Sequence, residues 1–408
     1  MEVVHPKCAG LDVHKDSVVA CARMMTGSEV RQEVQTFETT TRGLCELSDW
    51  LDERGCRHVV MEATGVYWKP VWHVLEGNFE LVLANAAHVK NVPGRKTDVN
   101  DATWLADLLA HGLVRGSFVP PTSIQDVRAL TRTRKQLVHE QVRHTQRIQK
   151  TLEDANVKLA SVVSNILGQS GRAMLDALVA GETDPEKLAD LANSRLRASR
   201  TQLVEALRGH VRDSHRFLLR LHLGQVDALD RAIAEVEKEV GEALGPFRER
   251  AEILTTIPGI GTTVARAIVS EIGTDMSRFP TSGHLISWAG LCPRNDESAG
   301  RRRSTRVRNG APWLKTMLVQ SAWAAVRSRT GYLRVQFMRL KSRRGPKKAI
   351  LAVAASMLTS IYCMLRDGVA YRDLGDDYFD RIDKQKAARR LVRRLTDLGF
   401  EVELKAAV

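Results

Sequence analysis

The stretch Ala9–Ala22, "AGLDVHKDSVVACA", decides the fold of the N-terminal part of this chain. An apolar run leads to Asp12, a polar turn "HKD" follows, and a second apolar run, "VVACA", comes next. Two short runs of β-forming residues joined by a polar turn predict a hairpin, with strands over 9–13 and 17–23. Burying a lone carboxylate in such a run is costly, so we expect Asp12 to have a partner.

The segments after this hairpin alternate between strand and helix patterns. In chain order they predict strand 30–37, helix 41–54, strand 58–61, helix 66–76, strand 81–84 and helix 101–111. Three paired strands followed by α-β-α-β-α is the order of an RNase H-like fold. Residues 1–118 are therefore predicted to form an α/β domain of this class.

The pair Pro120-Pro121 separates this domain from long, charged helical segments over 125–154 and 199–244. Six aliphatic residues between Val226 and Leu244 recur every three or four positions. Such a seam predicts an antiparallel helical pair or coiled coil, a connector over 119–250 that could mediate oligomerisation. An ordinary amphipathic helix that packs on its own domain is the alternative.

Residues 251–375 are predicted to form a mostly α-helical C-terminal domain, followed by a basic helical tail over 376–408. The domain begins with "ILTTIPGIGTTVARAIVSEIG", two apolar helices joined by a turn that contains Gly259 and Gly261. Such a helix-hairpin-helix can aim backbone N–H groups at a phosphate, so both glycines are predicted to bind nucleic acid. A tight helical turn without a ligand is the alternative.

The charge of the chain is unevenly distributed. The formal net charge is +13, and residues 290–350 contain 16 Lys and Arg but two acids, a balance of +14, so the remainder sums to about −1. One basic segment of this kind indicates a polyanionic partner, nucleic acid first of all. A ribosomal or membrane surface is the alternative.

No targeting or membrane segment is predicted. The start, "MEVVHPKCAG", lacks a signal-peptide pattern, and the six cysteines include no C-x-x-C pair, which indicates reduced thiols. The uncharged run 349–365 has 17 residues, fewer than the ~20 that span a bilayer, and is predicted to be a buried core helix. We therefore expect a soluble, cytoplasmic, nucleoid-associated protein without membrane contact.

Four carboxylates are candidate metal ligands. Asp12 and Glu62 each lie at the carboxyl end of a predicted strand, and Asp98 and Asp101 lie three residues apart at a helix start. Acids on convergent edges repel one another unless a cation lies between them, and such hard oxygen ligands suit Mg²⁺ or Mn²⁺. Two such ions can promote phosphodiester cleavage. Separately, the four could be a turn residue, a salt-bridge partner, a helix cap and a helix-dipole partner.

Several motifs together resemble a known family. "GLDVHK", "MEATGVYW", "KTDVNDA", "IPGIGTTVARAIVSEIG", "WAGLCPRNDESAG" and a following R-x-R-x-G-x-x-W-L occur in this order. The set is similar to that of the DEDD transposases of bridge-RNA-guided insertion sequences (the IS-one-ten type), and the resemblance covers nearly the whole chain.

The resemblance implies a RuvC-like N-terminal domain, a coiled-coil connector and a C-terminal serine transposase domain. The family's four acids correspond to Asp12, Glu62, Asp98 and Asp101, as the catalytic Mg²⁺-binding set. Its catalytic serine corresponds to Ser298. Many relatives have glycine directly after that serine, whereas this chain has Ala299, so Ser304 is the alternative nucleophile.

The implied activity is RNA-guided DNA transposition and recombination. Serine attack would give a covalent phosphoserine link, followed by strand exchange through a Holliday-junction-like intermediate. A structured noncoding guide RNA would pair with donor and target DNA. The protein would act as a tetramer, a dimer of dimers, in which the acids of one protomer meet the serine of another; the sequence leaves cis or trans assembly open.

Three arginines directly follow the serine segment and two more come soon after. Guanidinium groups hold phosphates bidentately and neutralise the charge of a pentavalent phosphorus. The residues predicted to do so are Arg301, Arg302, Arg303, Arg306 and Arg308. They could instead only anchor a DNA or RNA backbone.

Two other functions are compatible with these residues. One is a RuvC-like Holliday-junction nuclease in which water attacks and the C-terminal domain only binds. The other is a non-catalytic nucleic-acid-binding scaffold, which would need none of the four acids.

Overall fold

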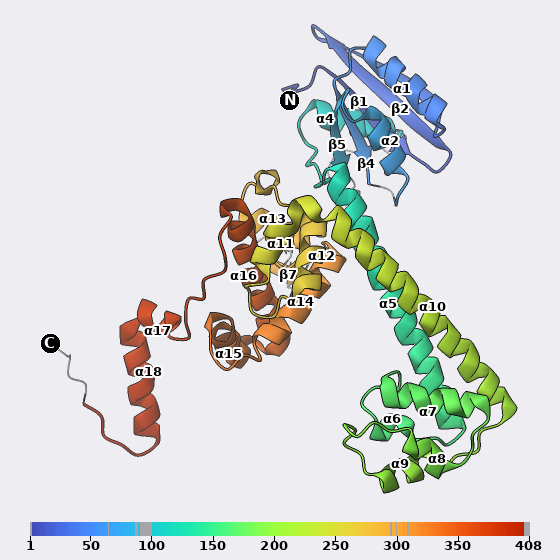
Figure 1. The fold of residues 1–408 in the computed structure, drawn as a ribbon. Coiled ribbons are helices and arrows are strands. Elements are labelled where there is room, and N and C mark those ends of the chain that lie inside the picture. The colour runs from blue at the N-terminus through green and yellow to red at the C-terminus, as the bar shows by residue number, and fades with distance from the viewer. Residues whose placement is uncertain are drawn as a thin grey trace. The chain divides into compact units, whose positions relative to one another are not determined.

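The computed structural model describes residues 2–63, 65–85, 89, 100–293, 296–298, 300–304, 306–307 and 310–403. Of Asp296, Ser298, Arg302, Arg303 and Lys386 it describes the backbone alone. The chain divides into two compact units, Met1–Val119 and Pro120–Val408 (Figure 1).

The first unit is built on one five-stranded sheet. Its strands are β1 (Lys7–Val13), β2 (Ser17–Thr26), β3 (Glu29–Glu38), β4 (His58–Glu62) and β5 (Glu80–Ala84). Their order is β3-β2-β1-β4-β5. The first three pair antiparallel, and β4 pairs parallel with both β1 and β5. This α/β arrangement is the one predicted for an RNase H-like domain.

Helices cover both faces of this sheet. The helices are α1 (Thr41–Glu53), α2 (Trp68–Leu75) and α4 (Asp101–Ala110). Leu11 and Met61 share a core with Leu47 and other residues of α1 and α2. Val60, which precedes Met61 and so points to the opposite face, shares a core with residues of α4.

Helix α4 crosses β1 at a very short distance. A Cβ atom on Gly10 would lie 2.2 Å from the carbonyl oxygen of Ala102 and 2.5 Å from the backbone N of Ala106. Any side chain at position 10 would therefore push α4 away from the sheet. Gly10 thus fixes where the start of α4 lies along β1.

The second unit begins with a long helical pair, as predicted. Helices α5 (Thr122–Asp154) and α10 (Asp213–Ala243) have 33 and 31 residues. The contacts Arg134–Glu237 and Gln141–Asp230 run in opposite chain directions, so the two helices are antiparallel.

A small helical domain lies at one end of this pair (Figure 1). Its helices are α6 (Leu159–Val162), α7 (Gln169–Ala180), α8 (Pro185–Asp190) and α9 (Arg200–Leu207). The prediction of one continuous helix over 199–244 is wrong, because α9 and α10 are separate. A Cβ on Gly209, between them, would lie 2.5 Å from the carbonyl oxygen of Ala155, so packing of the chain against the end of α5 replaces the helix there.

The C-terminal part of the second unit is mostly helical, as predicted. Its elements are η1 (Gly245–Phe247), α11 (Arg248–Leu254), α12 (Thr262–Ile272), η2 (Met276–Arg278), α13 (Ser282–Ala289), β6 (Asp296–Ser298), β7 (Arg301–Ser304), α14 (Pro312–Ala325), α15 (Tyr332–Arg344) and α16 (Pro346–Asp367). The tail adds α17 (Tyr378–Ile382) and α18 (Lys384–Asp397).

Helix α16 is the only helix among the described residues that is long and apolar enough to cross a membrane. Of its apolar window, 56% is buried inside the protein, including Val353, Met357 and Ile361. It packs against α13, α14 and α15, and so forms the core of this domain.

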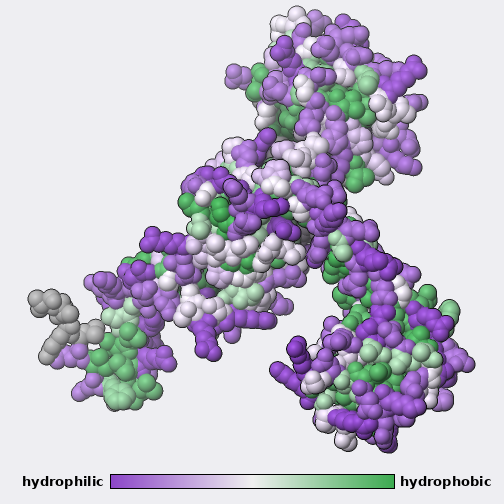
Figure 2. Space-filling view, viewed as in Figure 1, coloured by the Kyte–Doolittle hydropathy of each residue, from purple (hydrophilic) through white to green (hydrophobic). Residues whose placement is uncertain are grey.

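The tail helix α18 is basic and amphipathic. Leu391 and Leu395 are exposed at helical spacing on this arginine-rich helix, and the exposed Leu398 directly follows its last residue. Figure 2 shows this apolar strip on α18, whereas hydrophilic residues cover much of the rest of the visible surface.

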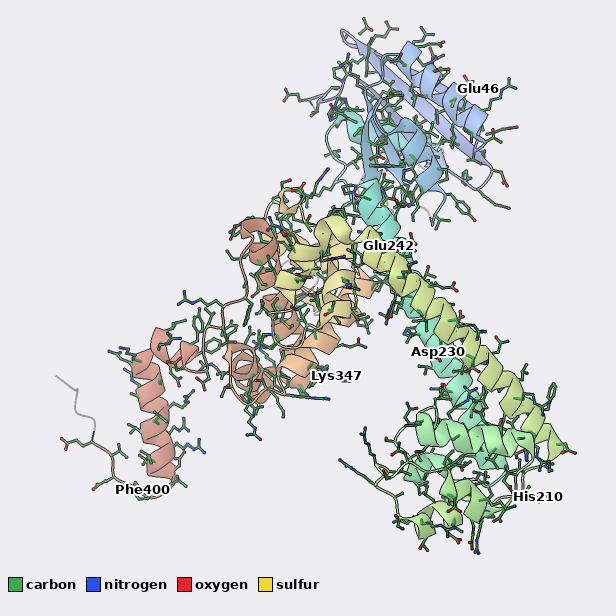
Figure 3. The ribbon with its side chains drawn as sticks, in the orientation of Figure 1. Glu46, His210, Asp230, Glu242, Lys347 and Phe400 are labelled. Carbon is green, nitrogen blue, oxygen red and sulfur yellow. The ribbon has the colours of Figure 1, made fainter. Side chains whose placement is uncertain are left out.

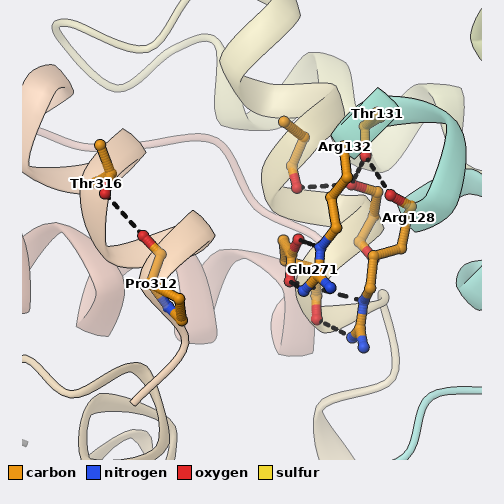
Figure 4. Close-up of polar contacts among 8 residues, drawn as sticks. Arg128, Thr131, Arg132, Glu271, Pro312 and Thr316 are labelled. Atoms are coloured by element: carbon orange, nitrogen blue, oxygen red, sulfur yellow. Dashed lines mark hydrogen bonds and ion pairs between the residues drawn. The ribbon is translucent and has the colours of Figure 1, made fainter. Parts of the chain in front are cut away.

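A buried ion pair joins α5 to α12 (Figure 4). Glu271 is 2% exposed, and Arg132 donates to its two carboxylate oxygens at 2.8 and 2.9 Å. Arg128 donates to the carbonyl of Ser270 at 3.2 Å, and its burial lowers its pKa to about 10. Lys135 lies 5.0 Å from the ring centre of Trp313, near the start of α14. The base of the helical pair is thereby fixed to the C-terminal helices.

Candidate functional site

Two of the four predicted acids lie at adjacent strand ends. In the parallel register, Leu11 of β1 is opposite Met61 of β4, and Asp12 and Glu62 each come one residue later. Because side chains alternate along a strand, these two acids point away from the core of α1 and α2. They therefore lie on the face of the sheet that α4 covers.

The third acid, Asp101, is the first residue of α4. The helix is capped by Asn100, whose side-chain oxygen accepts the backbone N–H of Ala102 at 3.0 Å. The close crossing at Gly10 holds this first turn over β1, two residues before Asp12. Two residues along a strand span roughly 6.6 Å, so the start of α4 lies close to the end of β1 that carries Asp12.

The fourth acid, Asp98, lies outside the described residues. One alternative role for Asp98 was to cap this helix, but the structure shows that Asn100 is the cap. The structure thus brings Asp12, Glu62 and Asp101 to one side of the sheet.

The surroundings of Asp12 leave it available to a cation. Its Oδ2 lies 3.1 Å from Nε2 of His14, an exposed imidazole. The Asp12 side chain is 23% exposed, so it is neither buried nor fully solvated. His14 restricts the orientation of the carboxylate through this one oxygen.

Arg23, a buried cation of this sheet, is neutralised by a carboxylate other than the predicted acids. Arg23 is 4% exposed and its Nε donates to Oδ1 of Asp107 at 2.9 Å. Asp107, within α4, is therefore the counter-ion of a buried arginine. Arg23 thus pairs with Asp107 of α4 and not with Asp12 or Glu62 at the strand ends.

The donor set suits a divalent metal, although it is not a closed site. Among the residues that the structure describes, no three His, Cys, Asp or Glu side chains lie close enough together to hold an ion. Asp12, Glu62 and Asp101 nevertheless offer carboxylate oxygens from one side of the sheet, and Mg²⁺ prefers such ligands in small numbers, with water completing its shell.

Ser298 ends the first strand of a short hairpin. It lies opposite Arg301 in the β6–β7 register, directly before the turn at Gly300. The φ of Gly300 is +72°, a conformation that favours glycine, and a Cβ there would meet nothing within 4 Å. Residue 300 is therefore glycine because of the turn, and Ser298 lies at the tip of the hairpin.

Ser304, the alternative nucleophile, lies at the other end of the same hairpin. It is opposite Asp296, and its hydroxyl oxygen accepts the backbone N–H of Arg306 at 3.2 Å. This hydroxyl is thus engaged in a local turn.

The base of the hairpin is fixed between α13 and α14. Pro293 pairs with Val307, and Ala311 donates its backbone N–H to the carbonyl of Trp288 at 3.2 Å. A Cβ on Gly310 would lie 2.4 Å from the backbone N of Gly290, so the two ends of the loop touch there. The hairpin therefore extends from a base that is held by backbone contacts between the end of α13 and the start of α14.

The predicted arginines follow Ser298 along the second strand. Arg301 and Arg306 are exposed, and neither makes an ion pair with a described residue. Arg302 and Arg303 belong to β7, and Arg308 lies outside the described residues. The hairpin therefore presents cationic residues next to its tip.

The two glycines of the predicted phosphate-binding turn differ in their surroundings. Gly259 has φ +85°, and a Cβ there would lie 2.4 Å from the carbonyl oxygen of Ser321. Packing against α14 alone thus accounts for this glycine. Gly261 is the N-cap of α12, where a Cβ would meet nothing within 4 Å. Phosphate binding by either residue stays a prediction.

The residues that position the site were not found from the sequence. Gly10 sets the place of α4, and Asn100 caps it. The one available signal was a glycine within an apolar strand, which often marks a close backbone approach.

Two family models match separate parts of the chain. A family model named DEDD_Tnp_IS110 and described as "Transposase" matches residues 9–157. A second, described as "Transposase IS116/IS110/IS902 family", matches residues 251–337. The first span contains all four acids and the second contains Ser298.

Similar proteins come from several bacteria. The chain is 29% identical over 331 residues to an insertion element IS116 protein of Streptomyces clavuligerus, covering 70% of this chain and 78% of that protein. It is 35% identical over 124 residues to an IS110 protein of Streptomyces coelicolor, 29% of each chain. It is 24% identical over 370 residues to the pilin gene-inverting protein of Moraxella bovis, 88% of this chain and 95% of the other.

Proposed function

Because this chain belongs to the IS110/IS116 family of transposases, and is thus a DNA transposase, we propose that it cuts and rejoins DNA by joint action of its acids and Ser298. The observation that carries this proposal is the convergence of Asp12 and Glu62, at adjacent strand ends, on the face covered by the start of α4.

The acids would hold a divalent cation, Mg²⁺ or Mn²⁺. Asp12, Glu62 and Asp101 would supply oxygen ligands, and Asp98 would be the fourth. The bound ion would supply positive charge against the oxygens of the scissile phosphodiester. His14 would keep the Asp12 carboxylate oriented, and Gly10 would keep α4 close enough for Asp101 to take part.

Ser298 would be the nucleophile. Its Oγ would form a bond to phosphorus as the bond from phosphorus to a deoxyribose oxygen breaks. The serine proton passes to a base and the departing sugar oxygen takes up a proton, so no oxidant or reductant is consumed. Attack by a sugar oxygen of another strand on the phosphoserine would reverse the step and join the new strands. The engagement of the Ser304 hydroxyl by the N–H of Arg306 supports Ser298 as the nucleophile.

The hairpin arginines would hold the phosphates around Ser298. Charge-assisted bonds from guanidinium groups are short and bidentate, and neutralise charge that develops on the phosphorus oxygens. The exposure of Arg301 and Arg306 supports this role.

We further propose a guide RNA and a tetrameric assembly. The +14 balance of residues 290–350 exceeds the need of one scissile phosphate, which supports additional nucleic-acid contacts. A relative named for inverting a pilin gene supports strand exchange as the outcome. The protein would work on chromosomal DNA in the cytoplasm, and the acids of one protomer would act with the serine of another.

The test is cleavage of DNA that carries the junction of the native element, with the element's flanking RNA, by purified full-length protein. The wild type is expected to give cut strands and a protein–DNA adduct that resists denaturation. Ser298→Ala should lose both, whereas Ser304→Ala should keep both. Asp12→Ala should also lose both.

Other outcomes of this experiment would support one of the alternative functions or the alternative nucleophile. Full cutting by Ser298→Ala without an adduct would indicate a junction nuclease that uses water. Full activity of Asp12→Ala would indicate a scaffold, and loss of the adduct in Ser304→Ala alone would move the nucleophile to Ser304.

A further inference from the structure

The cations of the basic segment form two separate groups. Of the 16 Lys and Arg in residues 290–350, five belong to the serine hairpin and its continuation. Six others occur in "RLKSRRGPKK", residues 339–348, which contain no acid. The structure places these ten residues at the junction of α15 and α16, with the 14-residue helix α14 between them and the hairpin in the chain. We call this junction the α15–α16 turn; its cations are Arg339, Lys341, Arg343, Arg344, Lys347 and Lys348.

Five of the six cations have no counter-charge among the residues that the structure describes. All but Arg339 are exposed, and these five make no ion pair with any residue that the structure describes. Arg339 lies 3.9 Å from Asp380, and Arg390 lies 3.2 Å from both oxygens of the same carboxylate. Asp380, the acid that contacts Arg339, is therefore already shared by two arginines.

The turn holds these charges on a rigid frame. Gly345 has φ +78° and both ends α15 and begins α16. Leu333 and Phe337 of α15 are buried, as are Ala349 and Ile350 directly after the turn. Figure 3 shows Lys347 at the edge of the C-terminal helices. Like charges held close together on helices repel one another, so this arrangement lowers stability unless an anion binds.

The composition of the turn identifies the kind of anion. Residues 339–348 contain no aromatic side chain on which an unpaired base could stack, and Leu340 is their only large apolar residue. Single-stranded nucleic acid is usually held by stacking, and a lipid surface by an apolar face. Cations alone suit the regular phosphates of a duplex.

We propose that the α15–α16 turn is a second DNA-binding surface, which grips the phosphate backbone of duplex DNA away from the serine hairpin. The proposal rests on the proposed function only in taking DNA as the polyanion; it does not depend on Ser298 or the acids. Such a grip carries no base specificity and would hold the duplex while the hairpin engages the scissile phosphate.

The test compares two full-length variants of equal charge. The first replaces Lys341, Arg343, Arg344, Lys347 and Lys348 by Gln. The control replaces five exposed cations of the helical pair and the small helical domain that make no ion pair among described residues: Arg143, Lys150, Arg195, Arg197 and Arg220. Binding to a labelled duplex of random sequence is measured by fluorescence anisotropy, without RNA, over a range of KCl concentrations.

Each phosphate contact contributes about 0.9 to the slope of log K against log salt. If three to five contacts are lost, the slope of the turn variant should fall by roughly 2.7 to 4.5. The control should keep the wild-type slope. Ser298→Ala should also keep it, so a failed nucleophile assignment would leave this result unchanged.

Three results would overturn the proposal. One is an unchanged slope in the turn variant, and another is an equal fall in the control, which would indicate bulk charge alone. The third is a slope that falls for an RNA hairpin of similar length but not for duplex DNA. If the fivefold variant does not fold, the double variants R343Q/R344Q and K347Q/K348Q carry the test, each with an expected fall of about 1.8.

Discussion

The ion pair between Glu271 and the arginines of α5 makes a quantitative prediction about stability. Glu271 is 2% exposed, whereas Arg132 has a side-chain exposure of 36%. Removing one partner of a buried pair typically costs about 3–5 kcal/mol, because the other charge stays buried without compensation. Since water reaches Arg132, we expect Glu271→Gln to cost about 3 kcal/mol, at the lower end of that range.

A stability loss of this size is easily measured. For domains of this size, 1 kcal/mol lowers the melting temperature by about 2–4 °C, so Glu271→Gln should lower it by about 6–12 °C. Differential scanning calorimetry of the full chain measures this shift, in the transition of the second unit.

Glu237→Gln is the matched control, since Glu237 accepts from Arg134 of the same helix α5 at 2.7 Å but is 49% exposed. An exposed pair contributes about 0.2–1 kcal/mol, so the control should melt within about 4 °C of the wild type. If Glu271→Gln melts together with Glu237→Gln, the pair does not stabilise the junction and the reasoning is refuted.

Three further predictions concern the packing of two glycines and the protonation of one histidine. Gly10→Ala should cost about 1–3 kcal/mol in a thermal melt and reduce DNA cutting, because the new methyl displaces α4; unchanged cutting would contradict the role of that crossing. Gly259→Ala should destabilise by about 2–4 kcal/mol through overpacking and its positive φ, while Gly261→Ala, facing open space, should be near neutral; equal effects would contradict the contact with α14. Burial lowers the pKa of His222, and His144 lowers it further, so the unfolded chain binds this proton at higher pH than the folded one. Stability should therefore fall as pH drops below about 6.5, and His222→Gln should flatten that fall; an unchanged pH profile of melting temperature would count against it.

The sequence by itself determined most secondary-structure elements and the family of this protein. Apolar periodicity located every strand of the five-stranded sheet and the long helix α5 to within a few residues, because each pattern depends only on neighbouring residues. It also predicted helix over the residues of α10, but not the break before it. The same patterns placed Asp12 and Glu62 at strand ends, and parallel strands bring such ends together. The order of motifs gave the family, which the family models confirm.

Only the tertiary structure decided how the helices and strands are positioned relative to one another within each unit. The crossing of α4 over Gly10, the packing of Gly259 on α14 and the ion pair of Arg132 with Glu271 each join segments more than 60 residues apart. The break at Gly209 overturned the expectation of a helical segment over 199–244 for the same reason. Helical periodicity indicates which face of a segment is apolar, but not which distant backbone segment packs against that face. The residues that position the acids and the base of the hairpin could therefore be identified only from the folded structure.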